Sequence, residues 1–223
     1  MLRQDYLLRL VAELMQVLLG VASLRHRGLH EQALREVDEA LRRLRDMEVS
    51  TAPPQEEFEA WITWCQHPAE EIRADLMLAV ARLWRERSQL LKLRDQPGAT
   101  RDARIVALGL FLEAVLNQGA MVSGELLDEI EGLGQETAEA ERPGGLLHRL
   151  MLYFEARGHY GRAEDVLFEW ADVCEPDARE RLLPVGKAFY ERLLELSDPE
   201  LEQGNLPRSE LESGRKEWLH HLV

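Results

Sequence analysis

The sequence is poor in the residues that mark disulfide-stabilised or β-rich proteins. It contains only two cysteines, Cys65 and Cys174, and they lie far apart in the chain. They could form one bridge, but we favour two buried free thiols in a reducing compartment. Isoleucine and threonine occur only four times each, whereas leucine is the commonest apolar residue. Unbranched side chains lose little rotamer freedom in helices, so this balance predicts an all-α protein.

The chain also lacks an excess of positive charge. It carries 27 lysine and arginine residues against 41 aspartate and glutamate residues, a formal net charge of -14. An acidic surface repels phosphate groups, which disfavours binding to nucleic acid and to anionic membranes. We therefore expect neither as a partner.

Targeting and membrane-spanning segments are not expected either. Polar residues interrupt the apolar N-terminus at regular intervals, and no small-residue cleavage site follows it. We expect no apolar run long enough to cross a bilayer, and hence a cytoplasmic protein.

Signatures of catalysis and metal binding are sparse. Glu217 and His220 form one E-x-x-H unit, but the helical di-iron sites that use this unit need a second one. The glycines at Gly144-Gly145 lack the strand and the Lys-Ser/Thr pair of a phosphate-binding loop, and no G-x-S-x-G motif occurs. We expect no catalytic residue, no metal and no cofactor, and thus a protein that is not an enzyme.

What the chain has in quantity is helical periodicity. Hydrophobic residues make up 45% of it, enough for a folded core. We expect a single all-helical domain over residues 1–223, with a subdivision into 1–95 and 100–223 as an alternative. Pro53 and Pro54 break one helix, and a short helical start is expected near Ser197. The other expected helices are Tyr6–Leu24, Leu29–Met47, Glu56–Cys65, Pro68–Arg94, Arg101–Asn117, Gly124–Glu141, Leu146–Arg157, Tyr160–Val173, Asp177–Leu196 and Pro207–His220.

Two side-chain clusters allow two interpretations each. The acidic run over residues 125–141 is typical of a solvated helix face, and the alternative is a docking surface for a basic partner. The aromatic residues of Glu56–Cys65 fit core packing better than an exposed anchor. Basic residues at 42–45 and 82–87 are interleaved with acids, as expected of helices stabilised by pairs four residues apart. The first helix has an unusually wide apolar stripe, which Leu8, Met15 and Leu19 extend to further faces.

Two expected hairpins share one pattern. Each has a glycine between its helices and a small residue five positions later: Gly28 with Ala33, and Gly158 with Ala163. Glycine permits the tight turn, and alanine lets the second helix pack closely. The larger residues at matching offsets are Leu147, Leu150, Phe154, Leu167 and Trp170 in one hairpin, and Val17, Leu24, Val37 and Ala40 in the other.

This pattern resembles a tetratricopeptide repeat, most clearly from Leu147 to Trp170. The resemblance implies antiparallel hairpins stacked as a right-handed superhelix. Ala33 and Ala163 are 130 residues apart, which is no multiple of the roughly 34-residue period, so an irregular array is expected. The chain also resembles an uncharacterised bacterial family of tetratricopeptide-like proteins through Gln4-Asp5-Tyr6, Arg162–Glu169 and the stretch from Phe189 to Pro207. That resemblance implies a fold and a bacterial source but no activity.

Such repeats bind peptides or proteins on a concave surface lined by the first helix of each pair. We expect that surface to carry Leu18, Ala22 and Arg25 in the first hairpin, and His148, Leu152 and Glu155 in the second. The Lys/Asn carboxylate clamp of some peptide-binding members is missing, which disfavours binding of a peptide C-terminus. The leading hypothesis is an adaptor or scaffold that binds another protein, with a homodimer through the first helix as a further expectation. The alternatives are a helical enzyme or ligand-binding protein with an interhelical pocket, and a regulator of a DNA-binding partner.

Overall fold

A computed structural model describes residues 2–46, 58–67, 70–138 and 142–221. This part of the chain is all helix and turn, which confirms the predicted all-α class. The proline break at residues 49–55 lies outside it. The helices are α1 (Leu2–His26), α2 (His30–Asp46), α3 (Phe58–Gln66), α4 (Glu70–Leu93), α5 (Pro97–Asn117), α6 (Gly124–Thr137), α7 (Gly144–Ala156), α8 (Tyr160–Val173), α9 (Pro176–Leu194), α10 (Asp198–Gln203) and α11 (Arg208–His221).

The chain forms two compact units, Met1–Ala140 and Glu141–Val223. The subdivision considered at residues 95–100 falls inside the first unit, in the turn that joins α4 to α5. The boundary between the units lies instead just before Pro143 and Gly144, at the start of α7.

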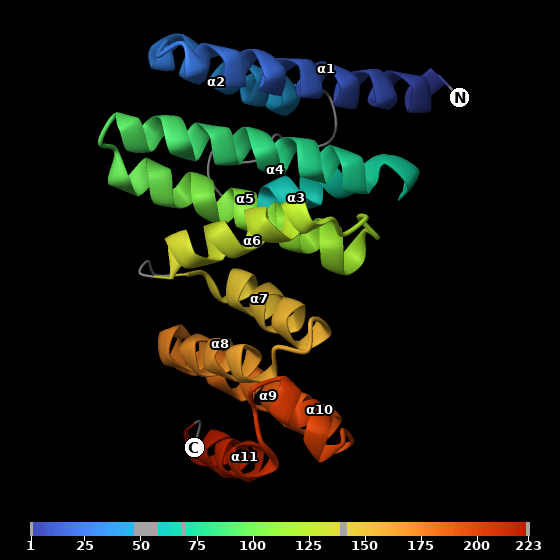
Figure 1. The fold of residues 1–223 in the computed structure, drawn as a ribbon, viewed down its shortest axis with the longest axis vertical. Helices are drawn as coiled ribbons and strands as arrows, with labels where there is room; N and C mark the ends of the chain where they lie inside the picture. The colour runs from blue at the N-terminus through green and yellow to red at the C-terminus, as the bar shows by residue number, and fades with distance from the viewer. Residues whose placement is uncertain (1, 47–57, 68–69, 139–141, 222–223) are drawn as a thin grey trace. The chain divides into compact units, whose positions relative to one another are not determined.

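In the first unit α4 is the central helix. The α1–α2 hairpin packs on one side of α4, α5 packs along another, and α3 and α6 contact α5 (Figure 1). Helices α4 and α5 are apolar on several faces, because each is buried from several sides. In α5 every residue from Ile105 to Ala114 is buried.

The aromatic residues of α3 belong to this core. Trp61 and Trp64 are 2% and 4% exposed, and Phe58 is 5% exposed. Trp61 makes edge contacts with Trp64 and Trp84, at ring-centroid distances of 5.9 and 5.5 Å. The interpretation of this segment as core is therefore confirmed, and the exposed-anchor alternative is wrong.

The turns of the α1–α2 and α7–α8 hairpins are built alike. Gly28 and Gly158 have φ angles of 75° and 72°, the left-handed region that glycine adopts without strain. In each turn the next residue donates its N–H to the carbonyl five positions before it: Leu29 to Leu24 at 2.9 Å, and His159 to Phe154 at 2.8 Å. Ala33 and Ala163 are both fully buried against their hairpins.

The second unit joins the α7–α8 hairpin to α9, α10 and α11. Helix α8 packs against α7, α9 and α11, and α10 contacts α11. Trp218 of α11 is fully buried and donates its indole N–H to the Leu183 carbonyl at 3.3 Å. Tyr190 of α9 donates its hydroxyl to the Glu164 carboxylate of α8 at 2.7 Å.

Helix α1 covers the first unit with one face only. Leu7, Leu10, Leu14 and Val21 are buried, whereas Leu8, Met15 and Leu19 are 51%, 39% and 62% exposed. The stretch Tyr6–His26 is long and apolar enough to cross a membrane by length and composition, and 22% of its most apolar window is buried. The expectation that no apolar run reaches this length is corrected. A core helix or a signal sequence passes the same test.

The closest approach in the first unit generates a stability prediction. A Cβ added to Gly109 of α5 would lie 2.5 Å from Cδ2 of the buried Phe58 ring, whereas one added to Gly98 of the same helix meets nothing within 4 Å. We expect Gly109→Ala to lower the free energy of unfolding by about 1–3 kcal/mol through overpacking. Gly98→Ala should leave it unchanged or raise it by up to about 1 kcal/mol. Urea denaturation measures both, and equal effects would contradict this packing.

Candidate functional site: a groove lined by α1, α4 and α6

The first unit carries an open groove of about 370 Å³ whose walls differ in chemistry. One wall is apolar and comes from α1. The other is charged and comes from α4 and α6. The lining residues are Met15, Leu18 and Leu19 on the apolar side, and Arg82, Arg85, Glu86, Glu125 and Glu129 on the charged side.

The apolar wall follows from the wide stripe of α1. Residues 15, 18 and 19 are three and four positions apart, so their side chains share one side of the helix. Leu14 and Val21, on another side, are buried in the core and fix the rotation of α1. Met15 and Leu19 are consequently left exposed and Leu18 half-buried.

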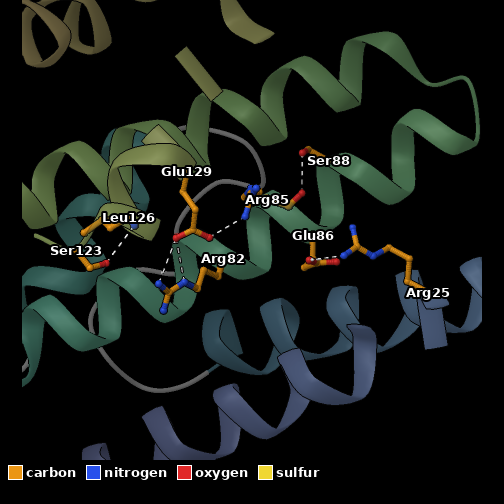
Figure 2. A network of polar contacts seen from close by, with 8 residues as sticks. All are labelled: Arg25, Arg82, Arg85, Glu86, Ser88, Ser123, Leu126 and Glu129. Atoms are coloured by element: carbon orange, nitrogen blue, oxygen red, sulfur yellow. Dashed lines mark hydrogen bonds and ion pairs between the residues drawn. The ribbon is translucent and has the colours of Figure 1, made fainter. Parts of the chain in front are cut away.

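The charged wall is organised by Glu129 of α6, which is 6% exposed (Figure 2). Arg85 donates to its Oε1 at 2.8 Å, and Arg82 donates to Oε2 through Nη2 at 3.2 Å and Nε at 3.3 Å. Two guanidinium groups thus neutralise one nearly buried carboxylate. A buried carboxylate requires such partners, because desolvation penalises its charge.

The start of α6 places Glu129 against α4. Ser123 is the N-cap residue, and its Oγ accepts the N–H of Leu126 at 3.2 Å (Figure 2). This bond satisfies one of the free N–H groups of the first turn. Leu126 is buried, so the cap and the apolar contact set the position of α6 together. On α4, Ser88 donates its hydroxyl to the Arg85 carbonyl at 2.7 Å.

Glu86 is the second carboxylate of the charged wall. Arg25 of α1 pairs with its Oε1 at 3.5 Å, while its Oε2 is buried without a hydrogen-bond partner among the described residues. Burial is the main cause that raises the pKa of Glu86 above 4.5. The charges of Arg25 and Arg85 oppose that rise, and the charge of Glu129 adds to it. Glu86 is thus a largely buried carboxylate with one paired and one unpaired oxygen.

The structure divides the six residues predicted for the concave surface between the two units. In the first unit Leu18 lines the groove, Arg25 reaches its charged wall through Glu86, and Ala22 is exposed but outside the lining. In the second unit the His148 ring lies 5.1 Å from that of Trp170. Glu155 accepts two bonds from Arg192, at 2.6 and 2.8 Å, and Leu152 is half-buried. The charged pair and the ring contact thus join neighbouring helices of one unit.

Two sequence interpretations require correction. Glu129, within the acidic run at 125–141, is neither solvated nor free for a partner, because Arg82 and Arg85 hold it. Glu136 of the same run pairs with Arg104 of α5 at 2.8 Å. The arginines of α4 were expected to pair within their own helix, but they pair with other helices. Residues 139–141 of the run lie outside the described part.

Elsewhere the expected pairing within a helix is present. Glu39 accepts hydrogen bonds from Arg42 and Arg43, three and four residues further along α2.

Sequence reasoning missed Glu86 and Glu129 as site residues. Both residues lie in charged segments of the sequence. That position does not predict ion pairing with a residue 40 or more positions away.

Metal chemistry has no visible support in the described part of the chain. No group of three or more His, Cys, Asp or Glu side chains there is placed to hold an ion. Glu217 and His220 of α11 are both exposed. Cys65 is buried and Cys174 half-buried, and both are free thiols.

Comparison with known proteins places the whole chain in one family. Residues 1–222 match the family described as "Family of unknown function (DUF6483)". The chain belongs to this family. No curated protein and no solved structure matches the DUF6483 chain. The resemblance to an uncharacterised family is thereby confirmed, while its tetratricopeptide-like and bacterial character stay predictions.

The arginine clamp on Glu129 generates a stability prediction. We expect Glu129→Gln to lower the free energy of unfolding by about 1–3 kcal/mol, since the amide leaves two guanidinium groups without a counter-charge. The lower end of this range is expected because both arginines are about a third exposed and partly screened. Asp128→Asn, at the exposed neighbouring position, is the control. Urea denaturation of both variants checks the prediction, and no difference between them would contradict it.

The raised pKa of Glu86 generates a pH prediction. A raised pKa means that the folded state binds a proton more tightly than the unfolded state. The contribution of Glu86 is therefore fully present below the unfolded pKa near 4.5 and is lost as pH rises through the folded pKa. We expect Glu86→Gln to remove this decline of unfolding free energy with pH, measured by urea denaturation at several pH values from 4.5 upward.

Glu39 is the control for that measurement. Hydrogen bonds from Arg42 and Arg43 lower its pKa, so its pH dependence lies below 4.5 and has the opposite sign. Glu39→Gln should leave the slope above pH 4.5 as in the wild type. A slope unchanged in Glu86→Gln would show that other groups produce the decline.

Proposed function

We propose that this chain is a non-enzymatic adaptor that binds another protein, with the groove lined by α1, α4 and α6 as its docking site. The occupant is an amphipathic helical segment of the partner. Its apolar side chains pack on α1, and its basic side chains pair with acids of the charged wall. The observation that carries the proposal is the exposed Met15–Leu19 wall, which lines one groove together with the exposed acid Glu125.

The apolar wall supplies the driving force for docking. Leu19 is 62% and Met15 39% exposed, so both have apolar surface left to bury. Removing such surface from water is worth roughly 25 cal/mol per Å². Methionine also adapts its shape to different partners. A helical segment that docks in an apolar groove uses anchor residues three, four and seven positions apart. Such anchors can pack against the row formed by residues 15, 18 and 19 of α1.

The charged wall favours a partner segment with positive charge. Glu125 is exposed and has no hydrogen-bond or ion-pair partner among the described residues. It offers carboxylate oxygens to lysine or arginine side chains beside the apolar wall. The net charge of -14 attracts basic segments over a longer range and speeds their encounter.

The chemistry of the lining favours binding over catalysis. Among the described residues that line the groove there is no histidine, cysteine, serine or tyrosine. Glu129 is neutralised by two arginines, which leaves it no role as a general base. We further propose a tetratricopeptide-like arrangement of the hairpins and a cytoplasmic location. The shared glycine turns at Gly28 and Gly158 support the arrangement, and the free thiols of Cys65 and Cys174 support the location.

Peptide binding tests the proposal. A labelled helical peptide of leucine and lysine, with the two residue types on opposite faces, is titrated with the full chain and followed by fluorescence anisotropy. We expect it to bind, and we expect a leucine–glutamate peptide of the same pattern not to bind. Leu19→Ser and Glu125→Lys should each weaken binding at least about fivefold, through lost apolar burial and reversed charge.

Matched controls separate the groove from general acidity. Leu93→Ser removes a leucine of α4 that is 60% exposed and outside the groove. Glu31→Lys reverses an exposed charge on α2. Both should bind as the wild type does, and weakening equal to that of Leu19→Ser and Glu125→Lys would contradict the proposal.

Light scattering tests the expected homodimer. A mass of twice 25.6 kDa that Leu19→Ser abolishes would place a second copy on α1 and contradict a partner segment in the groove.

A further inference from the structure

A second cavity lies where α2, α3 and α4 of the first unit meet. Its volume is about 480 Å³, within the range of small-molecule sites. It shares no lining residue with the groove described above. Its lining residues are Arg35, Asp38, Glu39, Leu41, Arg42 and Arg45 from α2, Trp61 from α3, and Trp84 and Arg87 from α4.

The charge of this lining is opposite to that of the chain. Four arginines and two acids give it a formal charge of +2, in a protein of net charge -14. Arg35, Arg42 and Arg45 are spaced seven and three residues apart, which aligns them along one side of α2. Arg35 is exposed and has no partner among the described residues, so its guanidinium is available. Arg42 shares the Glu39 carboxylate with Arg43, and Arg45 lies 4.0 Å from Asp46.

Buried N–H donors without acceptors border the same cavity. Trp61 and Trp84 are 2% and 3% exposed, and the Nε1 atom of each has no acceptor among the described residues. Arg87 lies over the Trp84 ring at 5.1 Å and donates through Nε to Asp38 at 2.8 Å. Its Nη1 is buried and likewise without an acceptor. Leaving a buried donor unpaired is costly, so an acceptor that reached these three lining residues would be stabilised by them.

We propose that this cavity binds a small phosphorylated molecule, through the dianion of a phosphate monoester. A phosphate monoester carries up to two negative charges and three strong acceptor oxygens, matching the +2 lining and its three unpaired donors. Arginine presents planar pairs of N–H groups that suit phosphate oxygens. The cavity exceeds the size of a phosphate group, and its Leu41 and tryptophan surfaces leave apolar contact for the organic part. This site is independent of the protein-docking groove, and neither proposal rests on the other.

Isothermal titration calorimetry of the full chain at constant ionic strength tests the proposal. The probes are glycerol 3-phosphate, inorganic phosphate and glycerol. We expect one site for glycerol 3-phosphate, weaker binding of inorganic phosphate, and no heat with glycerol. Arg35→Gln should weaken glycerol 3-phosphate at least about tenfold, as the loss of a charged hydrogen-bond donor predicts. The fold should tolerate this change, since Arg35 is exposed.

Arg215→Gln is the matched control. It removes the same charge from an exposed position of α11 in the second unit, outside the lining. It should change the affinity less than about twofold, because an exposed charge outside the site is screened. Equal losses of glycerol 3-phosphate affinity in both variants would show that the affinity depends only on overall charge, and would overturn the proposed site. So would the absence of heat with glycerol 3-phosphate.

The indole N–H signals supply a second readout. The chain has five tryptophans, and Trp170 and Trp218 belong to the second unit. In a ¹H–¹⁵N spectrum glycerol 3-phosphate should shift the indole signals of Trp61 and Trp84, identified with Trp61→Phe and Trp84→Phe. The signals of Trp170 and Trp218 should stay in place. Shifts confined to the second unit would contradict the proposal.

Discussion

The charged wall of the groove depends on one interaction, the pairing of Glu129 with Arg82 and Arg85. It joins α6 to α4 through a carboxylate that is 6% exposed. Without the two guanidinium groups, the buried charge of Glu129 would oppose the packing of α6. With them, α6 is held where Glu125, one turn earlier, borders the apolar surface of α1. Helix α4 also contributes Glu86 to the groove and Arg87 to the separate tryptophan-lined cavity.

The first unit thus uses charge in two ways. Some ion pairs connect helices, as Arg82 and Arg85 do with Glu129. In these pairs the charges of both partners are already neutralised. Other groups retain unused capacity: Oε2 of Glu86 lacks a donor, and Nη1 of Arg87 lacks an acceptor among the described residues. Native interiors pair nearly all of their buried polar groups, so these two atoms are exceptions within the first unit's charge network. The two surfaces differ in sign, which is why they fit different ligands.

The helices could be predicted from sequence because their signals are local. Apolar periodicity, proline at helix starts and glycine at helix ends place most boundaries within two or three residues, as for α8 at Tyr160–Val173. The burial of Trp61 followed from its spacing with Trp64. The partners of Glu129 could not be predicted in this way, because Arg82 lies 47 residues away and any exposed acid of α6 reads alike in sequence. Leu18, predicted from the repeat template, lines the groove and Arg25 pairs with Glu86 of its charged wall, whereas Ala22 from the same template lies outside the lining.

The central claim is that the groove beside α1 is a protein-docking surface, and the methyl signals of methionine test it most directly. Met15 lines the groove, Met121 is 88% exposed outside it, and Met77 is fully buried. In a ¹H–¹³C methyl spectrum, addition of the leucine–lysine peptide should shift Met15 and leave Met77 and Met121 in place. A shift of Met121 with Met15 unchanged would contradict the account.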